Sequence, residues 1–502
     1  MDYKIDKIIG IFSLLIVLTA ASPAIAQSES APSELTEGEA VRLALGNNPT
    51  LRAALLELQA AEQSLEAAES ERTPSFTASL SGGHDDSLGA TGSGPSPNES
   101  INLDLGLSWT SVVGTQLIFE AGGSWSAREA GSDSGVDNLG FDSAFGTEAR
   151  LRVVQPLLRG AGRDVGEARQ RAASFALASA EHSRDDTASD VLGDVLGAYW
   201  ELWYAQESLE VTQESLELAR QQLSEAEAQV NTLGTMARAD ALRFASEVAS
   251  LQEELVQAEA DRRIKALEFG RLLGISPETS QAIIAAEDGP SLDFDLDLDE
   301  AIELATLQSP ELLGLEADVA AAQDRIQTAR DATLPSLDLT ATVAVGNRWN
   351  ESNLDGWDTG DRPAITGLVG LELELPLSSS QARAELAETR ILAEAAELRF
   401  EARRDQIETD AMTSVERLET ARQRVSLANQ TVAISAELAE AERERLNLGM
   451  TTAFQVLESQ ASHRRTELRR LRAVVDRTKA AIDLHQLTGQ LLLNYAGLTE
   501  GL

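Results

Sequence analysis

Apolar residues recur along the chain at alternating steps of three and four, and the longest such series lies in the first half. Its members are Leu216, Ala219, Leu223, Ala226, Val230 and Leu233. This spacing is a heptad seam, which packs against a partner helix. No proline interrupts the stretch between Pro156 and Pro277, and Gly234 follows the seam, where a left-handed glycine ends a helix. We predict a helix over about 165–232 and a second over about 236–273.

The second half of the chain repeats the first. Residues 39–51 match residues 300–312 in order and type, at an offset of 261. The Leu-Gly pair that ends the seam recurs as Leu448-Gly449, at an offset of 215. A chance origin for several landmarks in the same order is improbable, so we interpret the chain as a duplication. Each half is expected to form one antiparallel helical hairpin with a very short turn.

The lengths of these helices suggest an elongated molecule. The duplication predicts helices over about 380–447 and 451–489, with Gly449 as the stop. A helix of about 67 residues spans about 100 Å. The helix after each turn has only about 38 residues, but each half also has an earlier helix of about 23, over 50–72 and 311–332. Stacked end to end, the two shorter helices would match the long one and build a tubular wall.

Between the short and long helices of each half, apolar and polar residues alternate, which predicts β-strands. The four clearest segments are 76–80, 148–154, 337–343 and 369–375, and two more, 101–109 and 115–125, occur only in the first half. We expect four to six strands per chain. That number is too small to close a large barrel, whereas three chains would supply about 12 to 18 strands.

Four of the six tryptophans belong to this strand region: Trp109, Trp125, Trp349 and Trp357. Aromatic residues at strand ends form girdles at the two surfaces of a membrane. The alternative is ordinary packing between the strands. The sequence therefore predicts a mainly α fold with a membrane β-barrel, in which duplicated hairpins form an α-barrel and the strands contribute to a trimeric β-barrel.

The expected segments follow from these elements. They are a signal peptide (1–26), an N-terminal segment with a short helix (27–72), strands and loops of repeat 1 (73–156), its helical hairpin (157–275), an acidic linker (276–299), the short helix of repeat 2 (300–333), its strands (334–377), its hairpin (378–490) and a C-terminal tail (491–502).

The N-terminus has the pattern of an export signal. Lys4 and Lys7 precede an apolar run over 8–21, and the small residues Ala24 and Ala26 mark a cleavage site, so the mature chain is expected to begin at residue 27. An uncleaved anchor helix is the alternative, although the run is short for a membrane span. After it, no run is long enough for a membrane helix, so membrane insertion would require a β-barrel.

Charge and composition narrow the function further. The net charge of −41 excludes nucleic-acid binding through phosphates, which needs a basic surface. The acid excess suits either simple solubility or a cation-favouring field inside a pore. The absence of cysteine excludes disulfides, a thiolate nucleophile and a lipidated N-terminal cysteine.

The sequence contains few features that would indicate an enzyme. The four histidines, at positions 84, 182, 463 and 485, lack metal-ligand spacing, and His84 is expected in an external loop. The glycines of 160–166 imitate a dinucleotide loop, but we interpret them as a joint between strand and helix. The alternating acids of 293–299 lack the glycine of a calcium loop and are expected to form a linker. We predict no catalytic residue, no metal site and no cofactor.

With this order of elements, the chain resembles the TolC family of outer-membrane efflux proteins. The resemblance covers nearly all of the mature chain and rests on motifs that occur twice in the same order: Asn-Pro-x-Leu and its counterpart at 308–312, the Pro-Ser pairs at 74 and 335, the Pro-Leu pairs at 156 and 376, and the Leu-Gly turns. It implies a homotrimer in the outer membrane of a Gram-negative bacterium, extending into the periplasm. It also implies a periplasmic adaptor (membrane fusion) protein, an inner-membrane pump and contact with outer-membrane lipid.

The resemblance also assigns residues to the periplasmic end. The adaptor-docking tips would comprise Leu233, Gly234, Thr235, Leu448, Gly449 and Met450. Acids after the turns often ring the pore entrance, where this chain has Asp240 and Glu458, with Gln455 where another acid is common. A solvated helix face is an equally good interpretation of those two acids. Family members often close the entrance with a Tyr and an Arg, but this chain has Leu446 and Thr451 there.

The predicted function is a passive exit duct for efflux or type I secretion, with the exported substrate left open. A structural coiled-coil protein of the cell envelope is the main alternative, and a periplasmic enzyme the weakest. The strand pairs discriminate between the first two, because a fibre needs no strands inserted between its helices.

Overall fold

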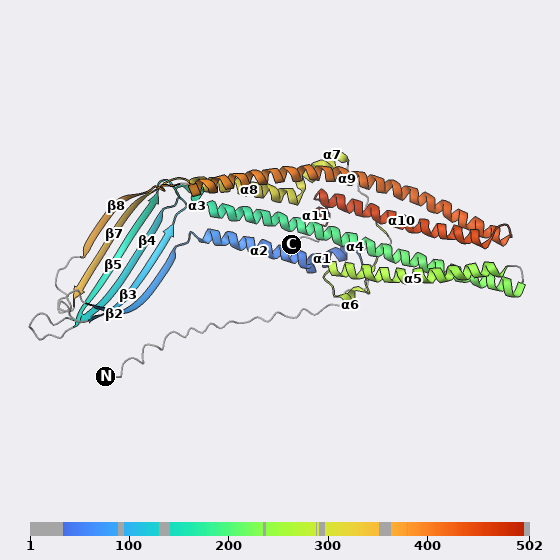
Figure 1. The fold of residues 1–502 in the computed structure, drawn as a ribbon, viewed down its shortest axis with the longest axis horizontal. Helices are drawn as coiled ribbons and strands as arrows, with labels where there is room; N and C mark the ends of the chain where they lie inside the picture. The colour runs from blue at the N-terminus through green and yellow to red at the C-terminus, as the bar shows by residue number, and fades with distance from the viewer. Residues whose placement is uncertain are drawn as a thin grey trace, which may run out of the picture.

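A computed structural model describes residues 34–88, 95–129, 141–233, 237–287, 289–290, 297–350, 363–378 and 380–495. The expected signal peptide (1–26), Gly234, Thr235, Trp357 and most of the acidic run 293–299 lie outside these ranges. The molecule is elongated, with a β-sheet at one end and the tips of two helical hairpins at the other (Figure 1). None of the described helices is long and apolar enough to cross a membrane.

The second hairpin has the bounds that the duplication predicts. Helix α9 spans Ser380–Asn447 and α10 spans Ala453–Leu487. Gly449 adopts a φ of 70°, and the backbone N–H groups of Gly449 and Met450 donate to the carbonyls of Leu446 and Arg445. These two bonds form a Schellman motif, which satisfies carbonyls that the helix end would otherwise leave unpaired. Gly449 is therefore confirmed as the stop.

The first hairpin departs from the single helix predicted over 165–232. A short α3 (Arg163–Gly166) precedes α4 (Ala168–Ala228), the final turn widens into a π-helix, η1 (Gln229–Leu233), and α5 follows (Arg238–Leu272). The break lies at Glu167, between α3 and α4. The chain approaches another element closely just before it, because a Cβ atom at Gly166 would lie 2.0 Å from the carbonyl oxygen of Val112, in the turn between two strands.

Two further helices in each half complete the predicted end-to-end stacks. They are α1 (Glu37–Asn47) and α2 (Pro49–Ser70) in the first half, and α7 (Leu298–Gln308) and α8 (Pro310–Asp331) in the second. The end of α5 meets the α1–α2 boundary, where a Cβ at Gly274 would lie 2.7 Å from the Asn47 carbonyl oxygen. The end of α10 meets the α7–α8 boundary in the same way, with Gly489 facing Gln308 at 2.6 Å.

The largest apolar core lies at the middle of the molecule, around α4. Tyr199 stacks edge-on against Trp200 and Phe269, and all three are almost fully buried. A small parallel sheet of β1 (Glu34–Leu35) and β6 (Ile284–Ala285) covers this cluster, and α6 (Pro277–Ser280) and α11 (Gln490–Asn494) are short flanking helices. Burial of this many aromatic and aliphatic side chains is the main source of stability in the helical part.

The sheet contains six antiparallel strands, the upper limit of the predicted four to six. In spatial order they are β2 (Ser75–Leu88), β3 (Pro95–Thr110), β4 (Gln116–Glu129), β5 (Phe141–Pro156), β7 (Ser336–Asn350) and β8 (Ala364–Glu374). The two repeats join through the β5–β7 pair. His84 lies on β2 rather than in the external loop expected for it, because this strand continues beyond the alternating segment. Among the described strands, β2 and β8 each have one neighbour, so the sheet of one chain is open.

Candidate functional site

The two faces of the sheet differ in polarity. Residues directly opposite each other on paired strands share a face, so the register assigns every side chain to one side. One face carries nearly all the large exposed apolar side chains of the sheet: Phe76, Leu80, Ile101, Leu103, Leu105, Leu107, Trp109, Phe119, Phe145, Leu151, Leu339, Val343, Val345, Ile365, Val369, Leu371 and Leu373. Among the apolar side chains of the sheet that the structure records as large and exposed, Leu368 alone lies on the other face.

An exposed apolar surface of this extent is unfavourable in water and marks contact with a membrane or another protein. Val369 on the edge strand is 74% exposed, and Phe76 on the opposite edge is 67% exposed. The register also aligns Trp125 with Phe145 across neighbouring strands of this face. The predicted aromatic girdle remains a prediction, although this alignment is the arrangement it requires.

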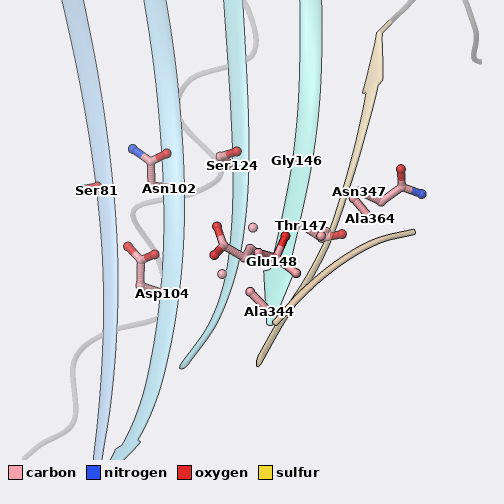
Figure 2. Close-up of a pocket in the computed structure, with 14 residues that line it drawn as sticks. Ser81, Asn102, Asp104, Ser124, Gly146, Thr147, Glu148, Ala344, Asn347 and Ala364 are labelled. Atoms are coloured by element: carbon pink, nitrogen blue, oxygen red, sulfur yellow. The ribbon is translucent and has the colours of Figure 1, made fainter. Parts of the chain in front are cut away.

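The opposite face is polar and hollow. One row of opposite residues crosses all six strands: Ser79, Asp104, Gly122, Glu148, Gly346 and Ala364. Figure 2 shows Asp104 of β3 and Glu148 of β5 in the hollow that this face lines. Gly122 lies between the two acids in this row, and Gly346 lies on the far side of Glu148. Neither carries a side chain, which leaves room for a hollow of about 720 Å³.

Basic side chains balance part of this acidity. The Arg150 guanidinium pairs with Glu148 at 2.5 Å and with Glu120 at 3.5 Å, and all three residues lie on the polar face. Such a face can hydrogen-bond to water along its whole length, whereas the apolar face cannot. This polarity is the pattern of a strand wall that separates an aqueous space from an apolar medium.

The predicted docking tips lie at the end of the molecule opposite the sheet. Leu448 is 73% exposed and Met450 is 65% exposed, although both are large apolar residues. Leu233 ends η1, while Gly234 and Thr235 lie outside the described residues. The second tip therefore presents an apolar surface to solvent, as a docking site requires, whereas the first is described only up to Leu233.

The predicted entrance acids lie on the helices that follow the two tips. Asp240 belongs to the first turn of α5, and Glu458 to the second turn of α10. Glu458 is exposed and pairs with Arg465 at 3.4 Å. Gln455 is also exposed, and its side-chain amide lies within a short hydrogen-bond distance of the Thr451 hydroxyl. The side chains share one end of the molecule, but their assignment to a pore remains a prediction.

The positions of the usual gate residues take part in contacts within the chain. Leu446 packs against a cluster formed by Ala226, Phe244 and Ala453, which joins the tips of the two hairpins. The Thr451 hydroxyl donates to Glu442 at 2.8 Å, and Glu442 also pairs with Arg445. An apolar contact at Leu446 therefore holds the tips of the two hairpins together.

The sequence analysis did not predict a pair of salt bridges between the two hairpins. Arg464 of α10 pairs with Glu247 at 3.2 Å and with Glu254 at 3.4 Å, both on α5, and its side chain is only 13% exposed. The two glutamates are seven residues apart and so share one face of α5. That spacing is a signal in the sequence, but it does not identify the partner.

A second set of salt bridges between the hairpins lies nearer the middle of the molecule. Glu201 of α4 accepts hydrogen bonds from Arg472 at 2.9 Å and Lys479 at 3.0 Å, both on α10. Burial by itself raises the pKa of Glu201, but these two cationic donors outweigh it, and the pKa is lowered overall. Glu201 is therefore held as a carboxylate that joins the two repeats.

Within the described residues, no group of three or more His, Asp or Glu side chains could hold a metal ion. The Gly160 and Gly162 segment, with φ values of 81° and 98°, forms the joint between β5 and α3, as predicted. Its amides bond to protein groups, because Gly160 N–H donates to Asp331 and Gly162 N–H donates to the Val113 carbonyl.

Comparisons with known proteins agree with this architecture. A family model described as outer membrane efflux protein matches residues 40–275 and 301–490. CyaE of Bordetella pertussis is 25% identical over 217 residues, which cover 42% of this chain and 44% of CyaE. This chain therefore matches less than half the length of that relative.

Solved structures show the same fold at low sequence identity. The CmeC outer membrane channel of Campylobacter jejuni superposes with a TM-score of 0.66 at 15% identity, covering 93% of this chain and 89% of CmeC. VceC of Vibrio cholerae gives the same score and identity, covering 90% and 96%. The MtrE channel of Neisseria gonorrhoeae gives 0.63 at 17% identity, covering 91% and 89%. With the family model matching most of its length, the chain belongs to the outer membrane efflux protein family.

Proposed function

We propose that three copies of this chain form one outer-membrane channel, a passive exit duct for efflux or type I secretion. The observation that carries the proposal is the open six-stranded sheet, which has an apolar face, a polar hollow face and an edge strand on each side. Family membership makes the chain a channel protein rather than an enzyme. A fibre-forming coiled coil would have no use for such a sheet.

Closure of the sheet requires further strands. The backbone N–H and C=O groups along the outer sides of β2 and β8 need partners when the apolar face is immersed in lipid. Pairing β8 of one copy with β2 of the next satisfies both edges and places the polar faces around one lumen. Three copies supply about 18 strands, a number that encloses an aqueous channel.

The helical part would continue this lumen across the periplasm. Helix α9 has 68 residues and is therefore about 100 Å long. The tips, including Leu448 and Met450, would dock a periplasmic adaptor protein, and an inner-membrane pump would supply the energy. The localisation that follows is the outer membrane of a Gram-negative bacterium, with the helices in the periplasm.

Because the chain lacks cysteine, edge pairing can be tested by introducing thiols. Thr77→Cys on β2 and Thr366→Cys on β8 lie in the same row of the polar face. A flexible bis-maleimide should link detergent-purified protein into dimers and trimers on a denaturing gel. The control pair Asn102→Cys and Ser124→Cys, opposite each other on β3 and β4, should link only within one chain. A monomer band alone for the edge pair would contradict the proposal.

The proposed entrance acids have a separate test. Replacing Asp240 and Glu458 by alanine should reduce the cation selectivity of single channels in planar bilayers, because two negative charges per chain are removed from the lumen. Glu253→Ala with Glu210→Ala removes the same charge from exposed helix positions farther from the tips. Equal selectivity in the two double variants would place Asp240 and Glu458 outside the conduction path.

A further inference from the structure

The two open edges of the sheet are the repeat counterparts of two strands that pair inside the chain. Strand β7 begins at Ser336, which lies 261 residues after Ser75, the first residue of β2. Pro156 at the end of β5 corresponds to Pro376, just after β8, at the offset of 220. Strands β5 and β7 form the seam between the two repeats. The missing contact between β8 and β2 is therefore the repeat equivalent of a contact that the structure already contains.

The β5–β7 seam has a register that the two offsets transfer to the open edges. Val154 of β5 lies opposite Thr340 of β7. Their counterparts are Glu374 of β8 and Ser79 of β2. In this register every residue of β8 except Ala364 faces a residue of β2. Nearly all the backbone groups along the β8 edge would then have hydrogen-bond partners.

The polarity of the two faces gives an independent check on this register. Glu374 and Ser79 both lie on the polar face of the sheet, and Leu373 and Leu80 both lie on the apolar face. The transferred register places Leu373 opposite Leu80. A shift by one residue would place Leu373 opposite Ser79 instead, and it would mix the two faces along the whole seam. The register taken from the duplication therefore keeps both faces continuous.

The chain just beyond the strand ends supports the same pairing. The backbone N–H of Leu157, after β5, donates to the Leu337 carbonyl at 2.8 Å. Their counterparts at the open edges are Leu377 and Phe76. Leu157 is 45% exposed, whereas Leu377 is fully exposed and Phe76 is 67% exposed. Contact between Leu377 of one copy and Phe76 of the next would cover two large apolar side chains that lack a neighbour at the edge.

The helical wall has the same arrangement of repeats. Helices α2, α4, α8 and α9 lie side by side in that order, so α4 of repeat 1 packs against α8 of repeat 2 (Figure 1). The repeat counterparts of α4 and α8 are α9 and α2, the two outer members of this row. Leu56 on α2 and Ile391 on α9 are each 65% exposed. The wall therefore ends in the same pair of counterparts as the sheet.

We propose that neighbouring copies join by repeating the seam between the two repeats, with β8 of one copy antiparallel to β2 of the next and Glu374 opposite Ser79. Helix α9 of one copy then packs against α2 of the next, as α4 packs against α8 within the chain. The inference rests on the proposed trimer and goes beyond it by fixing which residues meet. A second copy fits because it presents the counterpart of the edge that each repeat already binds.

This register staggers the copies along the strands. Thr77 lies opposite Pro376, which is ten residues from Thr366, or about 33 Å along the strand. A row of opposite residues therefore steps along the strands from copy to copy, as closure of a tilted barrel requires. A long flexible linker can join Thr77 and Thr366 over a range of registers, whereas a disulfide joins only residues that face each other directly.

The test replaces the same four residues in different pairs. Ser79→Cys with Glu374→Cys, and Ser81→Cys with Glu372→Cys, place two thiols directly opposite each other. Ser79→Cys with Glu372→Cys, and Ser81→Cys with Glu374→Cys, are slipped by two residues, which separates the residues by about 7–8 Å, too far for a disulfide. Copper phenanthroline oxidation of the full-length protein in detergent should link the opposite pairs into dimers and trimers on a non-reducing denaturing gel. The slipped pairs should stay monomeric.

The matched control is Arg152→Cys with Thr342→Cys, because these residues are the in-chain counterparts of Glu372 and Ser81. It should lose both free thiols on oxidation and stay monomeric. Two opposite pairs keep the test decisive if one variant folds poorly. Linking of a slipped pair in place of the opposite pairs, in protein that forms three-fold particles, would overturn this register and leave the proposed channel intact. No linking of any edge pair, while the control pair oxidises, would contradict both.

Discussion

The two end-to-end junctions of the helical wall have the same backbone but different chemistry. At the first, Asn48 caps α2 by accepting from Thr50 and Leu51 N–H and donates to the Leu272 carbonyl at 2.9 Å. At the second, Ser309 occupies the same place and makes no side-chain cap bond. The duplication thus preserved the geometry of the stack while the residues around it diverged.

The residues packed around the two junctions also differ. The first junction adjoins the large aromatic core around Tyr199 and Phe269. The second adjoins two small apolar clusters and a groove lined by five carboxylates and two guanidiniums. The difference indicates that the first junction depends more on apolar burial than the second does.

The largest expected effect on stability comes from removing a core side chain at the first junction. Phe269→Ala empties a fully buried position and should reduce the free energy of unfolding by about 3–5 kcal/mol. Leu484, its counterpart at offset 215, is equally buried in a smaller cluster, and Leu484→Ala should cost about 2–4 kcal/mol. Urea unfolding of both variants measures the difference, and a larger loss for Leu484→Ala would break the comparison.

Substitution of the glycine that both junctions share should lower the free energy of unfolding equally at each. Gly274 and Gly489 adopt φ values of 69° and 70°, and a Cβ at either would approach a backbone oxygen within 2.7 Å. Gly274→Ala and Gly489→Ala should therefore each cost about 2 kcal/mol through left-handed strain and contact. Thermal unfolding of the two variants should give matching shifts. A clearly smaller shift at one glycine would show that its junction can relax.

Substitution of the two N-cap residues should change the stability of the protein by different amounts. Asn48→Ala removes the cap and leaves the Leu272 carbonyl without its amide donor, at a cost of about 1–2 kcal/mol. Ser309→Ala removes no side-chain cap bond and should change stability by less than about 0.5 kcal/mol. Equal losses in equilibrium unfolding would mean that Ser309 has a partner in solution.

The smallest effect concerns pH. The pKa of Asp186 is raised to about 6 in the folded chain, so its protonated form is favoured there, and the stability it contributes is present below about pH 4 and lost as pH rises through about 6. His485 acts in the opposite sense. Burial lowers its pKa to about 4, so its contribution is present above about pH 6.5 and is lost as pH falls toward 4.

Comparison with a variant separates the two groups. Asp186→Asn keeps His485 and removes only the carboxylate. The wild type should gain stability relative to Asp186→Asn as pH falls from about 7 to about 4. Melting temperatures of both proteins across this range measure the gain. Parallel curves would show that Asp186 titrates normally in the folded chain.

Local signals in the sequence predicted much of the fold. The bounds of α9 followed from the proline gap and Gly449, and the two stacks followed from the duplicated landmarks. The break after Gly166 was not predicted, and the close approach of the Val112 carbonyl to Gly166 comes from a strand turn that is remote in sequence. The number of strands stayed open because the segments 101–109 and 115–125 have no counterpart in the second half, although the first of them alternates regularly.

The candidate surfaces were less predictable. Exposure of Leu448 and Met450 agrees with a docking tip, but their role depends on a partner that one sequence does not contain. The salt bridges from Arg464 to Glu247 and Glu254, and those that Glu201 forms with α10, depend on which helices become neighbours. That arrangement is fixed by tertiary packing, and no periodicity within one helix reveals it.

The central claim is that the chain completes its sheet and its helical wall only with sister copies. Electron microscopy of the detergent-purified full-length protein tests it most directly. The account predicts a particle with three-fold symmetry, a strand-built ring at one end and a helical stalk about 100 Å long. A solitary, compact particle that stays soluble and stable without detergent would contradict it.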